Sequence, residues 1–176
     1  MGWFTGDRQQ RARAQAEHHN ARGLRLAAAG RQQQALKAFE SAVALAPSLL
    51  DARVNCGSML YRLALNEAGE ARTQRLNEAA RHFRYVLGLD PTNAAATLDL
   101  AAACNALGEL DESLRLLQSL AHSHPQHRDV HYNLAVAYLH RGQREEARQA
   151  ALQELAHHPD HQQATRLLAE VGREGE

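Results

Sequence analysis

Four stretches of the chain repeat one pattern of small and apolar positions. In each stretch a small residue is followed, four positions later, by a residue suited to a packed interior. The four pairs are Ala35 and Phe39, Ala79 and Phe83, Ser113 and Leu117, and Ala147 and Ala151. A spacing of four places both members on one face of a helix. Upstream of each pair lies another small residue that lets a preceding antiparallel helix approach closely, namely Gly23, Gly57, Ala101 or Ala135. The pattern therefore predicts four helical hairpins.

The prolines repeat with the same pattern. They stand at Pro47, Pro91, Pro125 and Pro159, at intervals of 44, 34 and 34 residues. Because proline cannot continue a helix, a recurring proline marks a recurring helix end. A period of this length is typical of a solenoid of stacked units. Glycines at positions 30, 108 and 142 are predicted to end the first helix of their units in the left-handed conformation.

The repeat divides the chain into six segments. The predicted organisation is a tail and helix extension over 1–15, four units over 16–49, 50–93, 94–127 and 128–161, and a capping helix with a short tail over 162–176. In the last segment Ala164, Leu167, Leu168 and Val171 share one helical face, and Gly172 is expected to end the helix. A solenoid needs such a cap to cover the apolar face of its last unit.

The second unit is ten residues longer than its neighbours. Its additional residues contain no proline and are rich in good helix formers. The simplest prediction lengthens both helices by about five residues each, with the turn near Gly69. The projecting hairpin is either a docking element or a neutral embellishment.

The stretches "GLRLAAAGRQQQALKAFESAVALAP" and "NLAVAYLHRGQREEARQAALQELAHHP" resemble the tetratricopeptide repeat family. The resemblance covers residues 16–161 and implies an all-α fold, a right-handed α-solenoid of stacked antiparallel helix hairpins. The sequence departs from the family at its fourth position, where an aromatic residue is usual, and carries His19, Arg53, Thr97 and His131 there. Ala151 and Glu154 replace bulkier apolar residues, which predicts looser packing near the C-terminal end.

Composition narrows the classes of function. Twenty basic and twenty acidic residues leave no net charge, which disfavours nonspecific nucleic-acid binding. No apolar run approaches the roughly 20 residues that span a bilayer, so a soluble, cytoplasmic protein is expected.

Cys56 and Cys104 are expected to be buried free thiols. We find no phosphate-binding loop, paired metal motif or nucleophile motif, and we expect no enzymatic activity and no cofactor.

The resemblance implies a concave partner-binding groove lined by the first helix of each unit. The groove residues that it assigns are Asn20, Leu24, Asp51, Val54, Asn55, Ser58, Tyr61, Arg62, Leu98, Asp99, Asn105, Asp129, Tyr132, Asn133 and Val136. Their mixture of acids and apolar residues favours a protein or peptide with apolar anchors and some basic charge. The alternative is that the acids are simply solvated. A carboxylate clamp of the chaperone-binding type is disfavoured because Asp99 would repel the ligand.

Histidines gather in the turns that end the third and fourth units. His124 and His158, and likewise His127 and His161, are 34 residues apart, so each pair is expected to stack along one edge. Imidazoles bind zinc and titrate near pH 6.5, which leaves a metal site or a pH-sensitive cluster as alternatives to ordinary turn residues.

Two aromatic residues, Trp3 and Phe4, precede Arg8, Arg11 and Arg13. Two side chains bury too little area for stable membrane attachment, so contact with the protein itself or with another copy is favoured.

Taken together, the repeat, the groove and the missing catalytic motifs predict a noncatalytic scaffold or adaptor, for example an assembly factor. The alternative is a structural protein that assembles with itself through the N-terminal tail or through the hairpin of the second unit.

Overall fold

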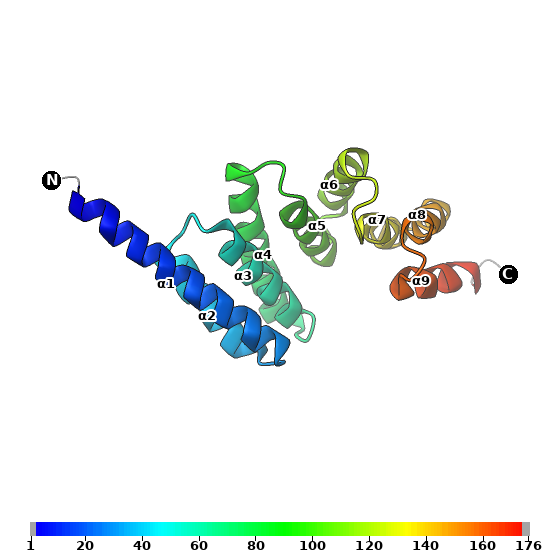
Figure 1. Cartoon of the computed structure of the whole chain (residues 1–176). Helices are drawn as coiled ribbons and strands as arrows, with labels where there is room; N and C mark the ends of the chain where they lie inside the picture. The colour runs from blue at the N-terminus through cyan, green and yellow to red at the C-terminus, as the bar shows by residue number, and fades with distance from the viewer. Residues whose placement is uncertain (1–2, 174–176) are drawn as a thin grey trace. The chain divides into compact units, whose positions relative to one another are not determined.

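A computed structural model describes the backbone over residues 3–173 and the side chains over residues 7–172. Every regular element in that range is an α-helix, which confirms the predicted all-α class. The helices are α1 (Trp3–Ala28), α2 (Gln32–Leu45), α3 (Leu50–Ala64), α4 (Gly69–Leu89), α5 (Ala94–Leu107), α6 (Leu110–Ser123), α7 (Val130–His140), α8 (Arg144–His157) and α9 (Gln162–Arg173). Consecutive helices pair as hairpin 1 (α1, α2), hairpin 2 (α3, α4), hairpin 3 (α5, α6) and hairpin 4 (α7, α8), and α9 follows (Figure 1). The chain divides into two compact units at residues 92 and 93.

The first unit contains hairpins 1 and 2, in which α3 packs against both α1 and α2. Phe39 and Phe83 are 1% and 0% exposed. Each phenyl ring lies over the glycine of the facing helix: a Cβ atom on Gly23 would come within 2.4 Å of Phe39, and one on Gly57 within 2.7 Å of Phe83. The predicted role of these two glycines in close helix packing is confirmed, since any side chain there would displace the facing phenyl ring.

The second unit contains hairpins 3 and 4 and the helix α9, which packs against α8. Its buried core is built from smaller side chains, including Ala101, Leu117, Ala135 and Ala151. Ala164, Leu167 and Val171 of α9 are buried, as expected for a capping helix. The predicted end at Gly172 is wrong, because α9 continues to Arg173.

The turns inside the hairpins follow the predicted glycine chemistry. Gly30, Gly108 and Gly142 have φ angles of 74°, 84° and 79°, a region in which glycine avoids the steric cost of a side chain. Gly108 is the left-handed C-cap of α5. Arg31 and Gly142 each continue the turn with backbone hydrogen bonds to the end of the preceding helix.

The additional residues of hairpin 2 are distributed unevenly between its helices, which corrects the prediction of equal lengthening. The first helix, α3, has 15 residues, compared with 14 in α5, whereas α4 has 21 residues, compared with 14 in α2, α6 and α8. The seven additional residues of α4 correspond to about 10 Å of helix. The turn was placed correctly, since Gly69 begins α4 with a φ angle of 61°. Arg75 holds the extension to the turn, with its Nε atom 2.8 and 2.7 Å from the two carboxylate oxygens of Glu67.

Both cysteines are buried and free, as expected. Burial and the nearby carboxylates of Glu40 and Glu78 raise the pKa of the Cys56 thiol to about 12. None of the helices in the described range is both long and apolar enough to cross a membrane.

Candidate partner-binding surface

The first unit supplies predicted groove residues from α1 and α3. Asn55 of α3 donates a hydrogen bond from Nδ2 to Oδ1 of Asn20 of α1 at 2.9 Å, and both side chains are half-buried. The two amides therefore already use part of their hydrogen-bonding capacity on each other. Their bond ties the first helices of hairpins 1 and 2 together.

The other predicted residues of this unit differ in exposure. Leu24 is 49% exposed, whereas Val54, Ser58 and Tyr61 are half-buried and Asp51 and Arg62 are exposed. The Ser58 hydroxyl donates to the Val54 carbonyl oxygen at 2.9 Å. This part of the surface thus offers one exposed leucine, one acid and one cation to a partner.

The second unit supplies a strip of half-buried apolar side chains. Leu98 of α5 and Tyr132 and Val136 of α7 pack against the buried core of the unit while remaining partly exposed. Asp99 is half-buried beside Leu98 on α5. Burial and the charges of Asp129 and Glu170 raise the pKa of Tyr132, which shows that acids flank the apolar strip. The preference for a partner with apolar anchors and basic charge stays a prediction.

The asparagines of the second unit are engaged within the protein. Asn105 is 8% exposed, and its Oδ1 atom lies 2.7 Å from Nδ1 of His140. Asn133 donates from Nδ2 to the Asp129 carbonyl oxygen at 2.8 Å. The Asn105 amide links α5 to α7, and the Asn133 amide bonds to the backbone at the start of α7. Both amides keep some hydrogen-bonding capacity for a ligand.

A buried carboxylate, which sequence reasoning did not identify as a functional group, organises the start of α7. Glu154 of α8 is 0% exposed. Its Oε1 accepts the backbone N–H of Asp129 at 2.9 Å, and its Oε2 accepts those of His131 at 3.1 Å and Tyr132 at 3.2 Å. The first N–H groups of a helix have no intrahelical acceptor, so Glu154 satisfies donors that would otherwise be buried without partners. The predicted looser packing at this position is wrong, because the space is filled by a fully bonded acid.

His161 extends this network to the capping helix. It is 1% exposed, its Nδ1 accepts the backbone N–H of Ala164 at 3.1 Å, and its Nε2 lies 2.7 Å from Oδ1 of Asp129. Since Nδ1 is an acceptor, the ring proton resides on Nε2 and is donated to the carboxylate. Asp129 itself has a φ angle of 71°, an unusual conformation that these contacts maintain.

Asp129, Glu154 and His161 bring three potential metal ligand atoms within 4.8 Å of one another. The hydrogen bonds do not fit a metal, however. A cation on Nε2 would leave both ring nitrogens without a proton, because Nδ1 faces the amide N–H of Ala164. The arrangement fits a neutral histidine that joins three segments of the second unit.

The predicted stacking of histidines 34 residues apart does not describe the contacts that the structure shows. His161 contacts Asp129 and Tyr132, and Nε2 of His158 lies 3.1 Å from the Gln126 carbonyl oxygen. The stacked pair is instead His131 with His157, whose ring centroids are 5.7 Å apart. The side chains of Trp3 and Phe4 lie outside the described residues.

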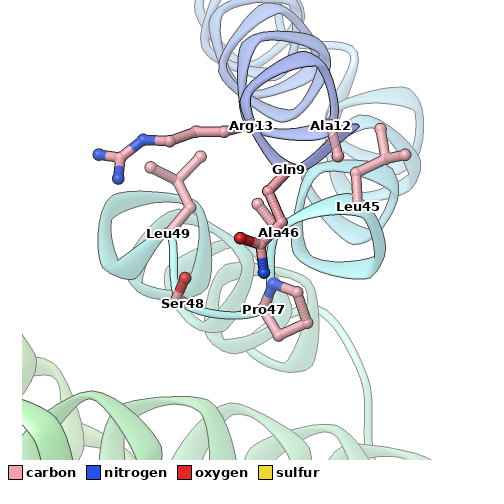
Figure 2. A pocket seen from close by; sticks show the side chains of 8 residues that line it. All are labelled: Gln9, Ala12, Arg13, Leu45, Ala46, Pro47, Ser48 and Leu49. Carbon is pink, nitrogen blue, oxygen red and sulfur yellow. The ribbon is translucent and has the colours of Figure 1, made fainter. Parts of the chain in front are cut away.

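A cavity of about 290 Å³ lies away from the predicted groove residues, between α1 and the turn at Pro47. Figure 2 shows Gln9, Ala12 and Arg13 of α1 facing Leu45 and the segment 46–49 across it. Arg13 is engaged by Glu17 at 3.1 Å. The cavity therefore marks where the N-terminal part of α1 passes over the first proline turn.

Comparison with known proteins decides the family. Residues 70–131 and 108–171 match the tetratricopeptide repeat, and together they cover more than half of the chain. The chain belongs to the tetratricopeptide repeat family. The predicted fold class, an all-α solenoid of antiparallel helix hairpins, is thereby confirmed. As in other tetratricopeptide repeat proteins, the fold favours a role in protein–protein interaction.

Solved structures of MamA are similar to this tetratricopeptide repeat chain. A crystal structure of MamA superposes with a TM-score of 0.70 at 18% sequence identity, covering 89% of this chain and 80% of that chain. A MamA structure from Desulfovibrio magneticus RS-1 has a TM-score of 0.68 at 18% identity, covering 90% of this chain and 93% of that chain. Identities at this level establish a common fold and nothing about shared partners.

One curated protein shares a local match. Trafficking protein particle complex subunit 12 of Mus musculus is 38% identical over 64 residues, which are 35% of this chain and 8% of that protein. The chain therefore spans a small fraction of this relative. The match is local and carries no argument about the activity of the whole protein.

Proposed function

We propose that the protein is a noncatalytic interaction scaffold or adaptor that holds a peptide or helix of a partner protein against the first helices of its hairpins. The observation that carries this proposal is the strip of Leu98, Tyr132 and Val136, which remains partly exposed beside Asp99 and Asp129. Apolar side chains that stay partly open on a folded unit are suited to receive the anchors of an amphipathic helix. The flanking acids favour a partner with arginine or lysine next to those anchors.

The asparagines support this proposal less directly than the apolar strip. Asn20 and Asn55 bond to each other, and Asn133 bonds to a backbone carbonyl. Replacing them would disturb the spacing of the first helices as well as any ligand contact. Variants of the apolar strip therefore give the cleaner test.

The test uses a synthetic amphipathic helix with leucines on one face and arginines beside them, labelled for fluorescence anisotropy. We expect the variant Leu98→Ala with Val136→Ala to weaken binding by about tenfold, because both anchors lose their apolar contact. The matched control is Leu89→Ala with Leu152→Ala, which shortens two leucines that are 59% and 43% exposed on second helices. Equal weakening in both variants, or equal binding of a scrambled peptide, would refute the groove.

The alternative proposal is self-assembly, and one observation favours it. The segment of α1 over residues 7–11 is exposed and includes Arg8 and Arg11, so it has the basic charge that the acids of the second unit would attract. We expect sedimentation equilibrium to show a mass that rises with concentration for the full chain and a monomer for a variant lacking residues 1–11. Monomers in both cases at high concentration would rule out assembly through this segment.

A further inference from the structure

A second candidate site lies on hairpin 1, away from the predicted groove. His19 and Arg22 of α1 and Gln34, Lys37, Ala38 and Ser41 of α2 line a hollow of about 290 Å³. We call it the basic hollow. Arg22 is two residues from both Asn20 and Leu24, which is about 200° around a helix. The basic hollow and the groove residues of α1 therefore lie on opposite faces of that helix.

The charge of the basic hollow is not balanced by its lining. Arg22 and Lys37 bring two cations, and none of the lining residues is acidic. The ion pairs of α1 in the described range, Arg11 with Asp7 and Arg13 with Glu17, involve other residues. The Ser41 hydroxyl donates to the Lys37 carbonyl oxygen at 2.8 Å, a contact with the backbone and not with the ammonium group. His19, whose Nδ1 atom is buried without a hydrogen-bond partner, adds an imidazole to the wall.

The corresponding hollow of hairpin 2 contains an acid. Forty-four residues further along, Glu78, Arg81, His82 and Tyr85 take the positions of Gln34, Lys37, Ala38 and Ser41, and with Arg53 they line a hollow of about 360 Å³. Glu78 supplies a carboxylate there. The Arg53 guanidinium lies 3.6 Å from the Tyr85 ring centroid and donates to the Pro47 carbonyl oxygen. Hairpin 1 keeps a cation at the position of Arg81, namely Lys37, but has Gln34 where hairpin 2 has Glu78.

The first unit as a whole carries a net positive charge, which also favours an anionic partner. The overall neutrality of the chain conceals an imbalance, because residues 1–92 carry thirteen Lys and Arg against eight Asp and Glu, and residues 93–176 carry seven against twelve. Along α1 the exposed positions Arg8, Arg11, His18, Arg22 and Arg25 recur at helical spacing and form one basic stripe. An anionic partner is therefore attracted to this unit before it reaches the basic hollow.

We propose that the basic hollow binds a carboxylate of an acidic peptide segment from a different protein, with Arg22 and Lys37 as the groups that hold it. A nucleic acid fits less well, because the basic hollow has no Phe, Tyr or Trp on which bases could stack. A second copy of the chain also fits less well. In the second unit Asp111 is already paired with Arg141 at 2.7 Å, and its neighbours Glu109 and Glu112 have partners of their own.

This site goes beyond the proposed groove and can fail independently of it. A groove on the first helices and a carboxylate site on the opposite face of α1 would let the protein hold two partners at once. That is the physical requirement for an adaptor.

The test uses the full chain and a fluorescein-labelled peptide of alternating Glu and Gly, followed by fluorescence anisotropy at low and moderate salt. We expect the variant Arg22→Ala with Lys37→Ala to weaken binding by about tenfold, because two charge-assisted contacts are lost. The matched control is Arg8→Ala with Arg25→Ala. It also removes two positive charges from the basic stripe, but neither residue lines the basic hollow. We expect that control to weaken binding by no more than about twofold, through the general field alone.

Four results would overturn the proposal. The first is equal weakening by both variants, which would leave only a diffuse field. The second is tighter binding of single-stranded RNA than of the acidic peptide. The third is binding of inorganic phosphate with no binding of the peptide. The fourth is a dimer, detected by sedimentation, that only the Arg22→Ala, Lys37→Ala variant loses. Circular dichroism confirms that both variants fold, and retention of peptide binding by the groove variant Leu98→Ala, Val136→Ala separates this site from the groove.

Discussion

The two units fill equivalent repeat positions with different chemistry. In hairpins 1 and 2 a glycine faces a phenyl ring, whereas hairpin 3 pairs Ala101 with Leu117 and hairpin 4 pairs Ala135 with Ala151. Val86 of hairpin 2 and Glu154 of hairpin 4 also share one position, and both are 0% exposed. The same buried site can therefore hold either an apolar side chain or an ionisable one. What decides between them is whether hydrogen-bond donors lie within reach.

In hairpin 4 those donors are the backbone N–H groups at the start of α7. The helix α5 starts at Ala94, directly after Asn93, whose side chain accepts the N–H of Ala96 at 3.0 Å. The corresponding helix α7 starts only at Val130, and Asp129 gives it no side-chain cap. Glu154 takes over that role from the opposite helix of the hairpin. Position 154 is thus a cap supplied at long range in the sequence.

The largest change in the free energy of unfolding is expected when Glu154 is replaced by valine, the residue that hairpin 2 has at the equivalent position 86. Glu154→Val places the residue of position 86 there, and it leaves the N–H groups of Asp129, His131 and Tyr132 without an acceptor. Each buried donor left unpaired costs about 1 to 3 kcal/mol. Allowing for partial access of water, we expect a loss of about 3 kcal/mol in the free energy of unfolding, measured by urea denaturation. Glu154→Gln, which keeps one acceptor oxygen, should lose about half as much.

The two cysteines report which unit responds. Cys56 is buried in α3 and Cys104 in α5, and a buried thiol reacts with iodoacetamide only after local opening. In Glu154→Val we expect faster labelling at Cys104 with little change at Cys56. Unchanged labelling of both thiols, together with unchanged stability, would show that the N–H groups do not depend on Glu154.

A smaller effect is expected from exchanging the core pairs. Gly57→Ala forces a Cβ atom to within 2.7 Å of the Phe83 ring. Overpacking of this kind costs about 1 to 3 kcal/mol, and the better helix propensity of alanine returns up to about 1 kcal/mol. We expect a net loss of about 1 to 2 kcal/mol by urea denaturation.

The double variant Gly57→Ala with Phe83→Leu recreates the pair that hairpin 3 already uses. We expect it to be more stable than the sum of the two single changes predicts, with a coupling of at least about 0.5 kcal/mol. Strict additivity would mean that the ring and the glycine are not matched to each other. It would also remove the explanation of why both hairpins of the first unit combine glycine with phenylalanine.

The sequence was sufficient for features that depend on neighbours along the chain. The repeat of Gly23 and Gly57 with Phe39 and Phe83 predicted the packing of the first unit. The glycines at 30, 108 and 142 predicted the turns of hairpins 1, 3 and 4. The lengthening of hairpin 2 was located correctly, but its division between the helices was not. No local signal distinguishes an added residue in α3 from one in α4, since both segments contain good helix formers.

The sequence was insufficient where partners are distant. Glu154 could be seen to occupy an apolar position, but its acceptor role depends on N–H groups 22 to 25 residues away. His161 was one of several histidines in the turns, and its burial follows from contact with Asp129, 32 residues earlier. A useful signal was nevertheless present. An acid at a position that must be buried requires a set of donors, and the unusual start of α7 was the place to look for them.

The smallest effect is expected from two ion pairs that tie turns in the two units. Glu67 and Arg75 of the first unit are 26% and 28% exposed, whereas Asp111 and Arg141 of the second are 83% and 47% exposed. Because solvent screens the exposed pair, we expect Asp111→Ala to change the free energy of unfolding by no more than about 0.5 kcal/mol. Glu67→Ala removes an acceptor that Arg75 contacts with both oxygens, and we expect it to cost about 1 kcal/mol. Raising the salt concentration should reduce the smaller loss further and leave most of the larger one. If the two variants lose the same free energy at both salt concentrations, the extension of α4 is not held by this contact and its packing alone keeps it in place.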